Sequence, residues 1–315
     1  MSGTVTLVEQ EIRSTPEILR RTIERLESRG DAFAAELKGP AVFLGCGSSS
    51  CIGMAAASLY EAARGEPAQG TIASEYRARA GWTHVAISRT GQTTELIEAM
   101  RRARAAGSRV ALICGGENAP AAAQADILLP LEFAAERSVI QTRFIAAATF
   151  ALRRMIEPDL ASTLAALPDR MEEVLAHFDP AELTEFNQIV FLGRGWRHGI
   201  AMLAALNLQE TALMAPNGYQ TLEYRHGPLA AADERTLVWC LDPQDDALSA
   251  AVLRDVGPSG ATVRCTGDDP LIAAAQAQLL ALRLAALRSI DPDAPRNLVR
   301  AIVLPDEPQL SSEPR

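Results

Sequence analysis

The pattern of apolar and polar positions in the first half of the chain alternates between strand-like and helix-like segments. Short apolar runs that predict strands occupy residues 41–45, 83–88, 108–114 and 126–131. Segments with apolar residues at helical spacing occupy residues 52–64, 93–106 and 139–155. Strands that alternate with helices are typical of parallel sheets, so the pattern predicts a doubly wound α/β fold.

Residues 5–38 come before the first predicted strand and have the pattern of helices. Pro16 stands near a helix start, and the apolar residues after it recur at a spacing of three or four. We therefore expect residues 1–38 to form an N-terminal helical arm.

The pattern then restarts in the second half of the chain. Residues 189–195 repeat the F-L-G-x-G of residues 41–47 at an offset of 148 positions (189 minus 41), and residues 259–269 repeat the character of residues 106–118. A repeat of about half the chain length predicts a duplication, with its boundary in the polar helical stretch 157–185. The expected units are the arm (1–38), a first domain with phosphate-binding loops (39–165), a second domain with acid–base residues (166–305) and a tail (306–315).

Composition and charge exclude several classes of protein. The chain of 315 residues is 48% apolar and 22% charged, with a net charge of -9, which argues against a protein that binds nucleic acid or anionic lipid. Its five cysteines are scattered without a CxxC pair, and the first residues do not form a signal peptide, so we expect a reducing cytoplasm. Apolar runs are too short or too interrupted for a membrane helix. Four histidines without HxxxH or HxH spacing predict no metal site.

Two strand-to-helix turns, residues 45–50 (GCGSSS) and 88–95 (SRTGQTTE), are rich in glycine and hydroxyl groups. In open α/β sheets ligands lie beyond the carboxyl ends of the strands, where the N–H groups of a helix start bind anions. Neither turn has the GxGxxG or GK[ST] pattern of nucleotide-binding loops, so together they predict a monophosphate site. The alternative for each is an ordinary N-cap. The candidate binding residues are Gly47, Ser48, Ser49, Ser88, Arg89, Thr90 and Thr93.

These loops, together with other segments, resemble the sugar isomerase (SIS) family, in particular the isomerase half of glucosamine-6-phosphate synthase and free-standing phosphosugar isomerases and deaminases. The similar segments are GCGSS (45–49), ASEYR (73–77), SRTGQTTE (88–95), ERSVIQTRFIAAA (136–148), FLGRG (191–195), ALNLQE (205–210), LEYRHGPLA (222–230) and PRNLVRAIVL (295–304). They cover nearly the whole chain in the family's order. The resemblance implies two tandem doubly wound, flavodoxin-like SIS domains in a homodimer, with no cofactor.

The resemblance also implies roles for individual residues. The residues that would surround the sugar phosphate are Ser49, Ser88, Arg89, Thr90 and Thr93. Arg300 would belong to a tail that closes over the sugar. Glu210 would carry a proton between C1 and C2. His226 would open the sugar ring by reaching across a dimer interface.

The proposed chemistry has its own physical basis. Aldose–ketose interconversion needs one base that takes a proton from one carbon and returns it to the next, and a carboxylate does this if burial raises its pKa. Glu210 lies in an otherwise apolar helical segment, and His226 lies in a turn where it can donate near neutral pH. The alternatives are a glutamate on a solvated helix face and a histidine that caps a helix or packs in an interface.

Departures from the family pattern restrict the mechanism. The synthase pattern has lysines where this chain has Asn207 and Arg300, and a Gln and a Ser where it has Arg89 and Thr90. Lys38 is the only lysine among 30 basic residues, and it is far in sequence from these motifs. Because a guanidinium stays protonated, a lysine-type imine mechanism is not expected.

The sequence therefore predicts a phosphosugar isomerase or deaminase that acts on a hexose 6-phosphate, with an amino sugar such as glucosamine or galactosamine 6-phosphate as the expected substrate. Two other hypotheses stay open. One is a sugar-phosphate-binding regulatory protein without catalysis, which the missing lysines favour. The other is a deglycase that cleaves a fructosamine-type phosphate adduct in the same site.

Overall fold

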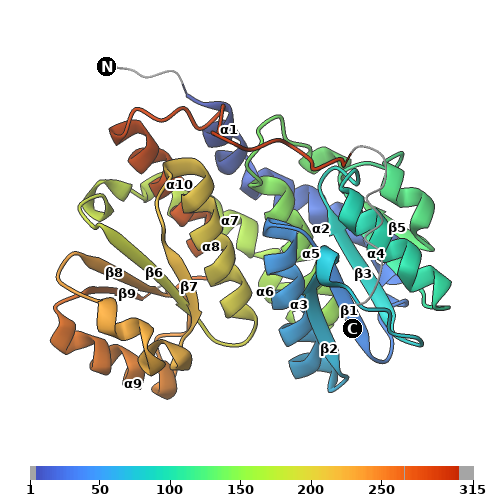
Figure 1. Ribbon diagram of the computed structural model, residues 1–315, viewed down its shortest axis with the longest axis horizontal. Coiled ribbons are helices and arrows are strands. Elements are labelled where there is room, and N and C mark those ends of the chain that lie inside the picture. The colour runs from blue at the N-terminus through green and yellow to red at the C-terminus, as the bar shows by residue number, and fades with distance from the viewer. Residues whose placement is uncertain (1–4, 266, 305–315) are drawn as a thin grey trace.

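Two parallel β-sheets with helices packed on them make up the structure (Figure 1). It is a computed structural model that describes residues 5–265 and 267–304. The strands of the first sheet follow the order β2-β1-β3-β4-β5, and those of the second follow β7-β6-β8-β9. All neighbouring strands are parallel. The predicted α/β class with parallel sheets is therefore confirmed.

The strands of each sheet come from one half of the chain. The first sheet contains β1 (Ala41–Gly45), β2 (Ala68–Ile72), β3 (Thr83–Ser88), β4 (Val110–Cys114) and β5 (Ile127–Pro130). The second sheet contains β6 (Gln188–Gly193), β7 (Asn217–Gln220), β8 (Thr236–Cys240) and β9 (Thr262–Cys265). The central strands β1 and β3 are buried over their whole length, as expected where helices cover both faces of a parallel sheet.

Helices fill the space between and around the sheets. They are α1 (Leu7–Arg13), α2 (Thr15–Ala34), α3 (Ser48–Arg64), α4 (Thr94–Ala105), α5 (Arg143–Ile156), α6 (Ala161–Ala165), α7 (Leu167–His177), α8 (Trp196–Ala212), α9 (Ala247–Val256) and α10 (Pro270–Leu287). Short 3-10 turns are η1 (Ala73–Glu75), η2 (Pro120–Gln124), η3 (Glu132–Ala134), η4 (Pro158–Leu160), η5 (Pro180–Leu183), η6 (Leu222–His226), η7 (Pro228–Ala231) and η8 (Gly257–Ser259). The helix predicted from residue 139 begins only at Arg143, because the carbonyl groups of residues 138–140 accept hydrogen bonds from Arg89 instead.

The turn from β1 to α3 and the turn from β6 to α8 have the same backbone shape. Gly47 caps α3 with φ 54° and ψ -128°, and Gly195 caps α8 with φ 55° and ψ -131°. A Cβ atom added to Gly45 or Gly193 would lie 2.4 or 2.5 Å from the backbone of the following helix. Only glycine satisfies these requirements, so the F-L-G-x-G repeat has the same structural cause in both halves.

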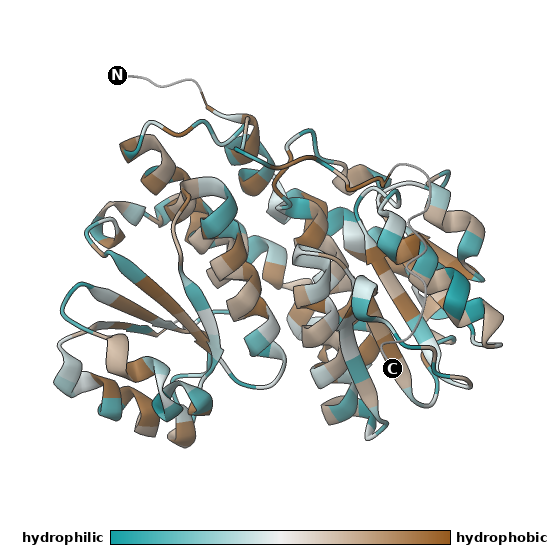
Figure 2. Ribbon diagram, viewed as in Figure 1, coloured by the Kyte–Doolittle hydropathy of each residue, from teal (hydrophilic) through white to brown (hydrophobic). Residues whose placement is uncertain are grey.

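Helices α3 and α8 cross closely between the sheets and join the two halves. A Cβ atom added to Gly199 of α8 would lie 2.5 Å from the carbonyl oxygen of Cys51 in α3. One apolar core extends from Phe43 and Phe144 in the first half to Phe191 in the second. Figure 2 shows apolar residues along the central strands and more polar ones on the outer helices. Because the halves share a core, the boundaries of two separate domains stay a prediction.

Helix α10 belongs to this shared core. Among the described residues it is the one helix long and apolar enough to cross a membrane, and 78% of its 18 residues are buried inside the fold. It packs against α8 and α7, which identifies it as a core helix. The same residues contain no group of three or more His, Cys, Asp or Glu side chains that could hold a metal ion.

After α10 the chain crosses the N-terminal arm and returns to the first half (Figure 1). The Asp293 carboxylate accepts hydrogen bonds from the N–H groups of Leu7 (2.8 Å) and Val8 (3.0 Å), which are free at the start of α1. The Thr94 N–H at the start of α4 donates to the Ile302 carbonyl oxygen (3.2 Å). The predicted tail, residues 306–315, lies outside the described residues.

Candidate active site

The two predicted phosphate loops lie side by side at the carboxyl end of the first sheet. Strands β1 and β3 are neighbours, so the turns that follow them meet at one edge. Between them is a pocket of about 290 Å³, part of it open to solvent. Its lining consists of Cys46, Ser49, Ile87, Ser88, Arg89, Thr90, Thr93, Leu96, Gln141 and Arg300. The structure thus brings six of the predicted residues together, and the other two, Gly47 and Ser48, shape the first loop at the start of α3.

Local hydrogen bonds set the shape of the second loop. Gly91 has φ +60°, and a Cβ atom there would lie 2.5 Å from a neighbouring side chain. The Gly91 N–H donates to Ser88 Oγ (2.9 Å), and the Gln92 N–H donates to Thr90 Oγ1 (3.2 Å). Thr93 is the N-cap of α4 but makes no capping hydrogen bond with its side chain. Its hydroxyl is therefore available to an anion at this helix start.

Arg89 lines the pocket, but most of its guanidinium binds to the protein itself. The side chain is 4% exposed, and Nη1 lies 3.1 Å from Oε2 of the fully buried Glu136. Nη1 donates to the Ser138 carbonyl oxygen (3.1 Å), and Nη2 donates to those of Val139 (2.8 Å) and Arg300 (3.1 Å). Within the described chain only Nε lacks a partner. Glu136 therefore offsets the charge of Arg89, and Arg89 chiefly holds the loop that follows Glu136.

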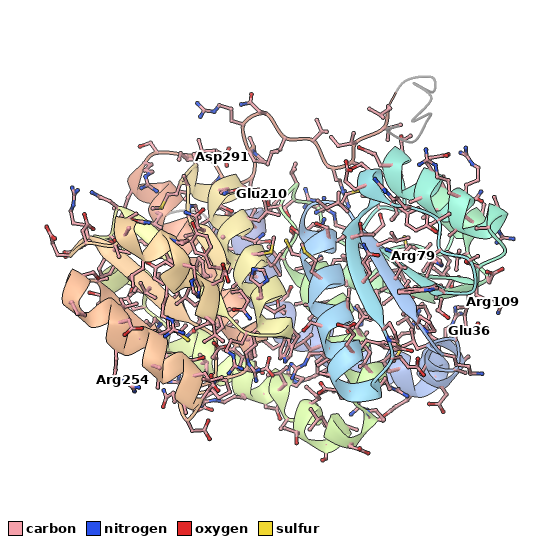
Figure 3. All side chains as sticks on the ribbon, turned by 60° about the horizontal axis from the view of Figure 1, so that its bottom comes forward. Glu36, Arg79, Arg109, Glu210, Arg254 and Asp291 are labelled. Carbon is pink, nitrogen blue, oxygen red and sulfur yellow. The ribbon has the colours of Figure 1, made fainter. Side chains whose placement is uncertain are left out.

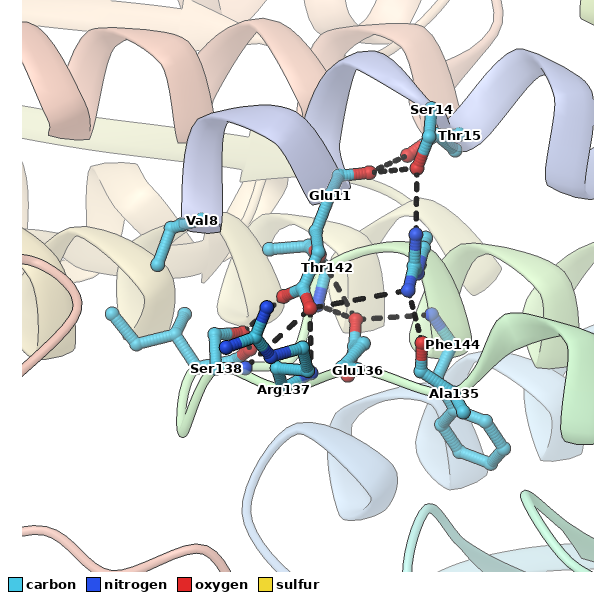
Figure 4. Close-up of polar contacts among 12 residues, drawn as sticks. Val8, Glu11, Ser14, Thr15, Ala135, Glu136, Arg137, Ser138, Thr142 and Phe144 are labelled. Carbon is cyan, nitrogen blue, oxygen red and sulfur yellow. Dashed lines mark hydrogen bonds and ion pairs between the residues drawn. The ribbon is translucent and has the colours of Figure 1, made fainter. Parts of the chain in front are cut away.

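Two buried carboxylates hold this loop, which also carries the pocket residue Gln141 (Figure 4). Glu136 Oε1 accepts hydrogen bonds from the N–H (2.7 Å) and Oγ1 (2.9 Å) of Thr142. Glu11 of α1 accepts from the Arg137 N–H (2.6 Å) and from Ser138 Oγ. Burial raises the pKa of Glu136, while Arg89 and these hydrogen bonds lower it. The N-terminal arm thus supports a wall of the pocket.

Arg300 lies at the mouth of the pocket on the segment after α10. Its side chain donates to the Glu136 carbonyl oxygen, and its own carbonyl oxygen accepts from Arg89. The residue is otherwise exposed to solvent. It therefore provides the more accessible positive charge of the two arginines.

Glu210 reaches the same region from the second half of the chain. It lies near the end of α8, close to the boundary between the halves (Figure 3). Its Oε2 atom is buried without a hydrogen-bond partner among the described residues. Burial raises the pKa of Glu210 to about 7, and the nearby Asn207 amide and the charge of Arg89 limit the rise. Glu210 does not itself line the pocket, but the charge of Arg89, which does line it, lowers the pKa of Glu210. A carboxyl group with such a pKa can exchange protons near neutral pH.

His226 lies apart from this site in the single chain. It is exposed at the end of η6 and does not line the pocket. Its side chain has no hydrogen bond to another described residue. A role for His226 in the site, and its approach from a second copy, stay predictions.

The same edge of the second sheet is filled by the protein's own carboxylates. Asp246 is the N-cap of α9 and forms an ion pair with Arg194 (2.7 Å), and these contacts lower its pKa to about 2. Asp242 is buried and accepts hydrogen bonds from the Arg194 N–H (2.7 Å) and Thr221 Oγ1 (2.6 Å). Of the two sheet edges, the first therefore has the open donors for an anion.

Sequence reasoning missed four residues of the lining, the apolar Ile87 and Leu96 as well as Cys46 and Gln141. It also missed the role of Glu136. Gln141 belongs to a segment that the family pattern already marked, and its buried Oε1 atom has no partner in the described chain. Burial raises the pKa of the Cys46 thiol to about 11, so this group is neutral at physiological pH. The sequence indicated that these segments matter but not which side chains face the pocket.

Comparison with known proteins agrees with this geometry. The SIS domain family matches residues 38–154, which contain the whole first sheet, both phosphate loops and the Glu136 loop. This part of the chain is similar to a SIS domain. The resemblance seen in the sequence is thereby confirmed.

Similar proteins extend the match to both halves of the chain. It is 28% identical to a glutamine–fructose-6-phosphate aminotransferase (isomerizing) of Caulobacter vibrioides, over 94% of this chain and 58% of the relative. The chain thus spans little more than half the length of that enzyme. Its fold is similar to that of a glucosamine-6-phosphate deaminase of Thermotoga maritima (TM-score 0.83, 23% identity, 95% of this chain and 100% of the other). It is also similar to the C-terminal domain of a glucosamine–fructose-6-phosphate aminotransferase of Francisella tularensis (TM-score 0.79, 22% identity, 93% and 99%).

Proposed function

We propose that this protein is an enzyme of the phosphosugar isomerase type that acts on a hexose 6-phosphate. The observation that carries the proposal is the Glu210 carboxyl group, which is unpartnered at Oε2, has a pKa of about 7 and interacts with Arg89 of the hydroxyl-lined pocket. The phosphate binds between the loops of Ser49 and Ser88, where helix N–H groups and hydroxyls attract an anion. The sugar chain then extends toward Glu210.

The proton transfer follows from this placement. In the open-chain sugar Glu210 takes the proton from C2, the electrons of the C–H bond form a double bond between C1 and C2, and the C1 carbonyl oxygen takes a proton from water, which gives an enol or enamine. The same carboxyl group returns its proton to C1, and the hydroxyl or amino group on C2 releases a proton to water as its double bond to C2 forms, which gives the 2-keto or 2-imino product. One group with a pKa near the working pH suits both steps.

The substrate that we propose is a 2-amino-2-deoxyhexose 6-phosphate, such as glucosamine or galactosamine 6-phosphate. Proton transfer to C1 then leaves an imine at C2, and water hydrolyses it to a ketose 6-phosphate and ammonia. The names of the relatives support an amino sugar, since they are an aminotransferase that acts on fructose 6-phosphate and a glucosamine-6-phosphate deaminase. Cleavage of a larger fructosamine-type adduct would use the same proton transfer.

We further propose a cytoplasmic homodimer of chains with two SIS-type halves, 39–165 and 166–305. The exposed position of His226 is compatible with the dimer, in which this residue would open the sugar ring in the site of a second copy. The matching Gly47 and Gly195 turns support the duplication.

The experiment is an assay of ketose phosphate and ammonia with purified protein and each amino-sugar phosphate. We expect both products in equal amounts, and a loss of about 100-fold or more in kcat for Glu210→Gln. Glu185→Gln, on the exposed surface, is the matched control and keeps full activity. Calorimetric binding of the sugar phosphate without turnover would show the regulatory binding protein instead, and full activity of Glu210→Gln would refute the mechanism.

A further inference from the structure

Two buried amide side chains, Asn207 on the same helix as Glu210 and Gln278 in contact with Asn207, are not yet used by the proposed reaction. Asn207 is one turn before Glu210 on α8 and is completely buried, so the two side chains share a face of the helix. Gln278 of α10 is 6% exposed, and Gln141 belongs to the pocket wall. Buried amides of this kind are held by their hydrogen bonds.

The contacts of Asn207 fix which way its amide points. Its Nδ2 atom lies 3.5 Å from the backbone carbonyl oxygen of Gln141, which can only accept. The opposite atom, Oδ1, therefore faces Gln278 and accepts a hydrogen bond from its Nε2 atom at 2.9 Å. The remaining N–H of Asn207 is left for the Glu210 carboxylate, which lies one turn further along the same face of α8 and whose pKa Asn207 lowers. The hydrogen bond from Gln278 thus fixes the Asn207 amide, with its oxygen toward α10 and its nitrogen toward the Gln141 loop.

We propose that Gln278 and Asn207 are positioning residues that together deliver a neutral hydrogen-bond donor to the Glu210 carboxylate. This proposal rests on the proposed role of Glu210. Gln278 prevents the Asn207 amide from turning its oxygen toward Glu210, where it would repel the carboxylate. Asn207 in turn holds one carboxylate oxygen, which leaves Oε2 free for the substrate.

The pair of Gln278 and Asn207, called the relay below, also helps to set the balance between the charged and neutral forms of Glu210. The groups that face Glu210 are Arg89 across the boundary, the Cys51 thiol of α3 and the amide of Asn207. Burial raises the pKa of Cys51 to about 12, so that group is neutral. Glu136 offsets the charge of Arg89, and Asn207 carries none. The Glu210 carboxylate is therefore stabilised only by a neutral amide and a compensated cation, which permits a pKa of about 7.

The test measures the protonation of Glu210 directly, without a substrate. Glutamate carboxyl carbons are labelled with carbon-13 and titrated by NMR, and the Glu210 signal is the one that Glu210→Gln lacks. We expect a wild-type midpoint of about 7. Because a hydrogen bond to the charged form lowers a carboxyl pKa, Asn207→Leu and Gln278→Met should raise the midpoint by about one pH unit. The acid limb of kcat/KM should move by the same amount.

A matched control lies on the same helix. Gln276 is 4% exposed and its Oε1 atom has no partner among the described residues, and Gln276→Met should leave the midpoint unchanged. A midpoint for Gln278→Met equal to that of the wild type, or an equal rise in Gln276→Met, would overturn the relay. If a variant does not fold, a titration of the wild-type protein still tests the proposal. The side-chain amide signals of Asn207 should shift with the Glu210 midpoint, and their independence from it would also overturn the proposal. Absence of turnover with an intact relay would refute the proposed function alone.

Discussion

The buried ion pair between Arg89 and Glu136 should dominate the stability of the pocket wall. Arg89→Met removes the cation and leaves Glu136, which is fully buried, without its opposite charge. Removal of one partner of such a pair destabilises a protein by about 3–5 kcal/mol. The lost hydrogen bonds to the carbonyl groups of Ser138, Val139 and Arg300 act in the same direction. We therefore expect a loss near the upper end of that range.

The matched variant Glu136→Gln keeps an acceptor for Thr142 but removes the negative charge. It should destabilise by a similar amount, because the Arg89 charge is then buried alone. The double variant buries no charge, so its loss should be smaller than the sum of the two single losses by at least about 2 kcal/mol.

Urea unfolding of the wild type, the two single variants and the double variant gives these free energies, and an unchanged m-value shows that the comparison is valid. Calorimetry with a sugar phosphate measures binding separately. Additive losses within about 0.5 kcal/mol, together with a loss of phosphate affinity in Arg89→Met alone, would refute the reasoning. Arg89 would then be a ligand of the phosphate and not a support of the loop.

Three further predictions concern other parts of the fold. Burial lowers the pKa of His84 from 6.5 to about 4, so the unfolded chain binds the proton more tightly than the folded one. About 3 kcal/mol of stability should therefore be lost as the pH falls from 6.5 to 4, which urea unfolding across this range measures. An equal loss in His84→Gln would contradict the assignment to His84. Gly91→Ala places a Cβ atom at φ +60° and 2.5 Å from a neighbouring side chain. We expect the free energy of unfolding to fall by about 1–3 kcal/mol and sugar-phosphate binding to weaken. Thermal unfolding identical to that of the wild type would exclude this strain. Asp246→Ala removes the N-cap of α9 and the ion pair with Arg194, and should cost about 1–2 kcal/mol in urea unfolding without reducing phosphate affinity; a fall in affinity would place an anion site in the second half.

The predictable part of the fold is the part with a strong local signal. Strands β1, β3 and β6 are continuous apolar runs, because both faces of a central parallel strand are buried. Strands β2 and β7 lie at sheet edges and are half exposed, and their sequences AQGTI and NGYQ do not have this signal. Strand β8, TLVWC, has the signal and was overlooked.

The residues of the candidate site also divide into those with a strong local signal in the sequence and those without one. Glycine and hydroxyl residues at two strand ends marked the pocket, because sheet order brings neighbouring strand ends together. The partner of Arg89 was not predictable, since Glu136 is 47 positions away and only the folded loop brings its carboxylate to the guanidinium. Likewise, the contact of Asn207 with Gln278 joins helices 71 positions apart. Local patterns identify such residues but not their contacts.

Proton exchange with solvent tests the central claim most directly. A hexose 6-phosphate or its 2-amino analogue is incubated with the enzyme in D2O, and loss of the proton at C2 or C1 is followed by NMR. We predict exchange by the wild type, with an acid limb at the Glu210 midpoint of about 7, and a rate at least about 100-fold lower for Glu210→Gln. Exchange by Glu210→Gln at the wild-type rate would show that another group carries the proton and would contradict the account.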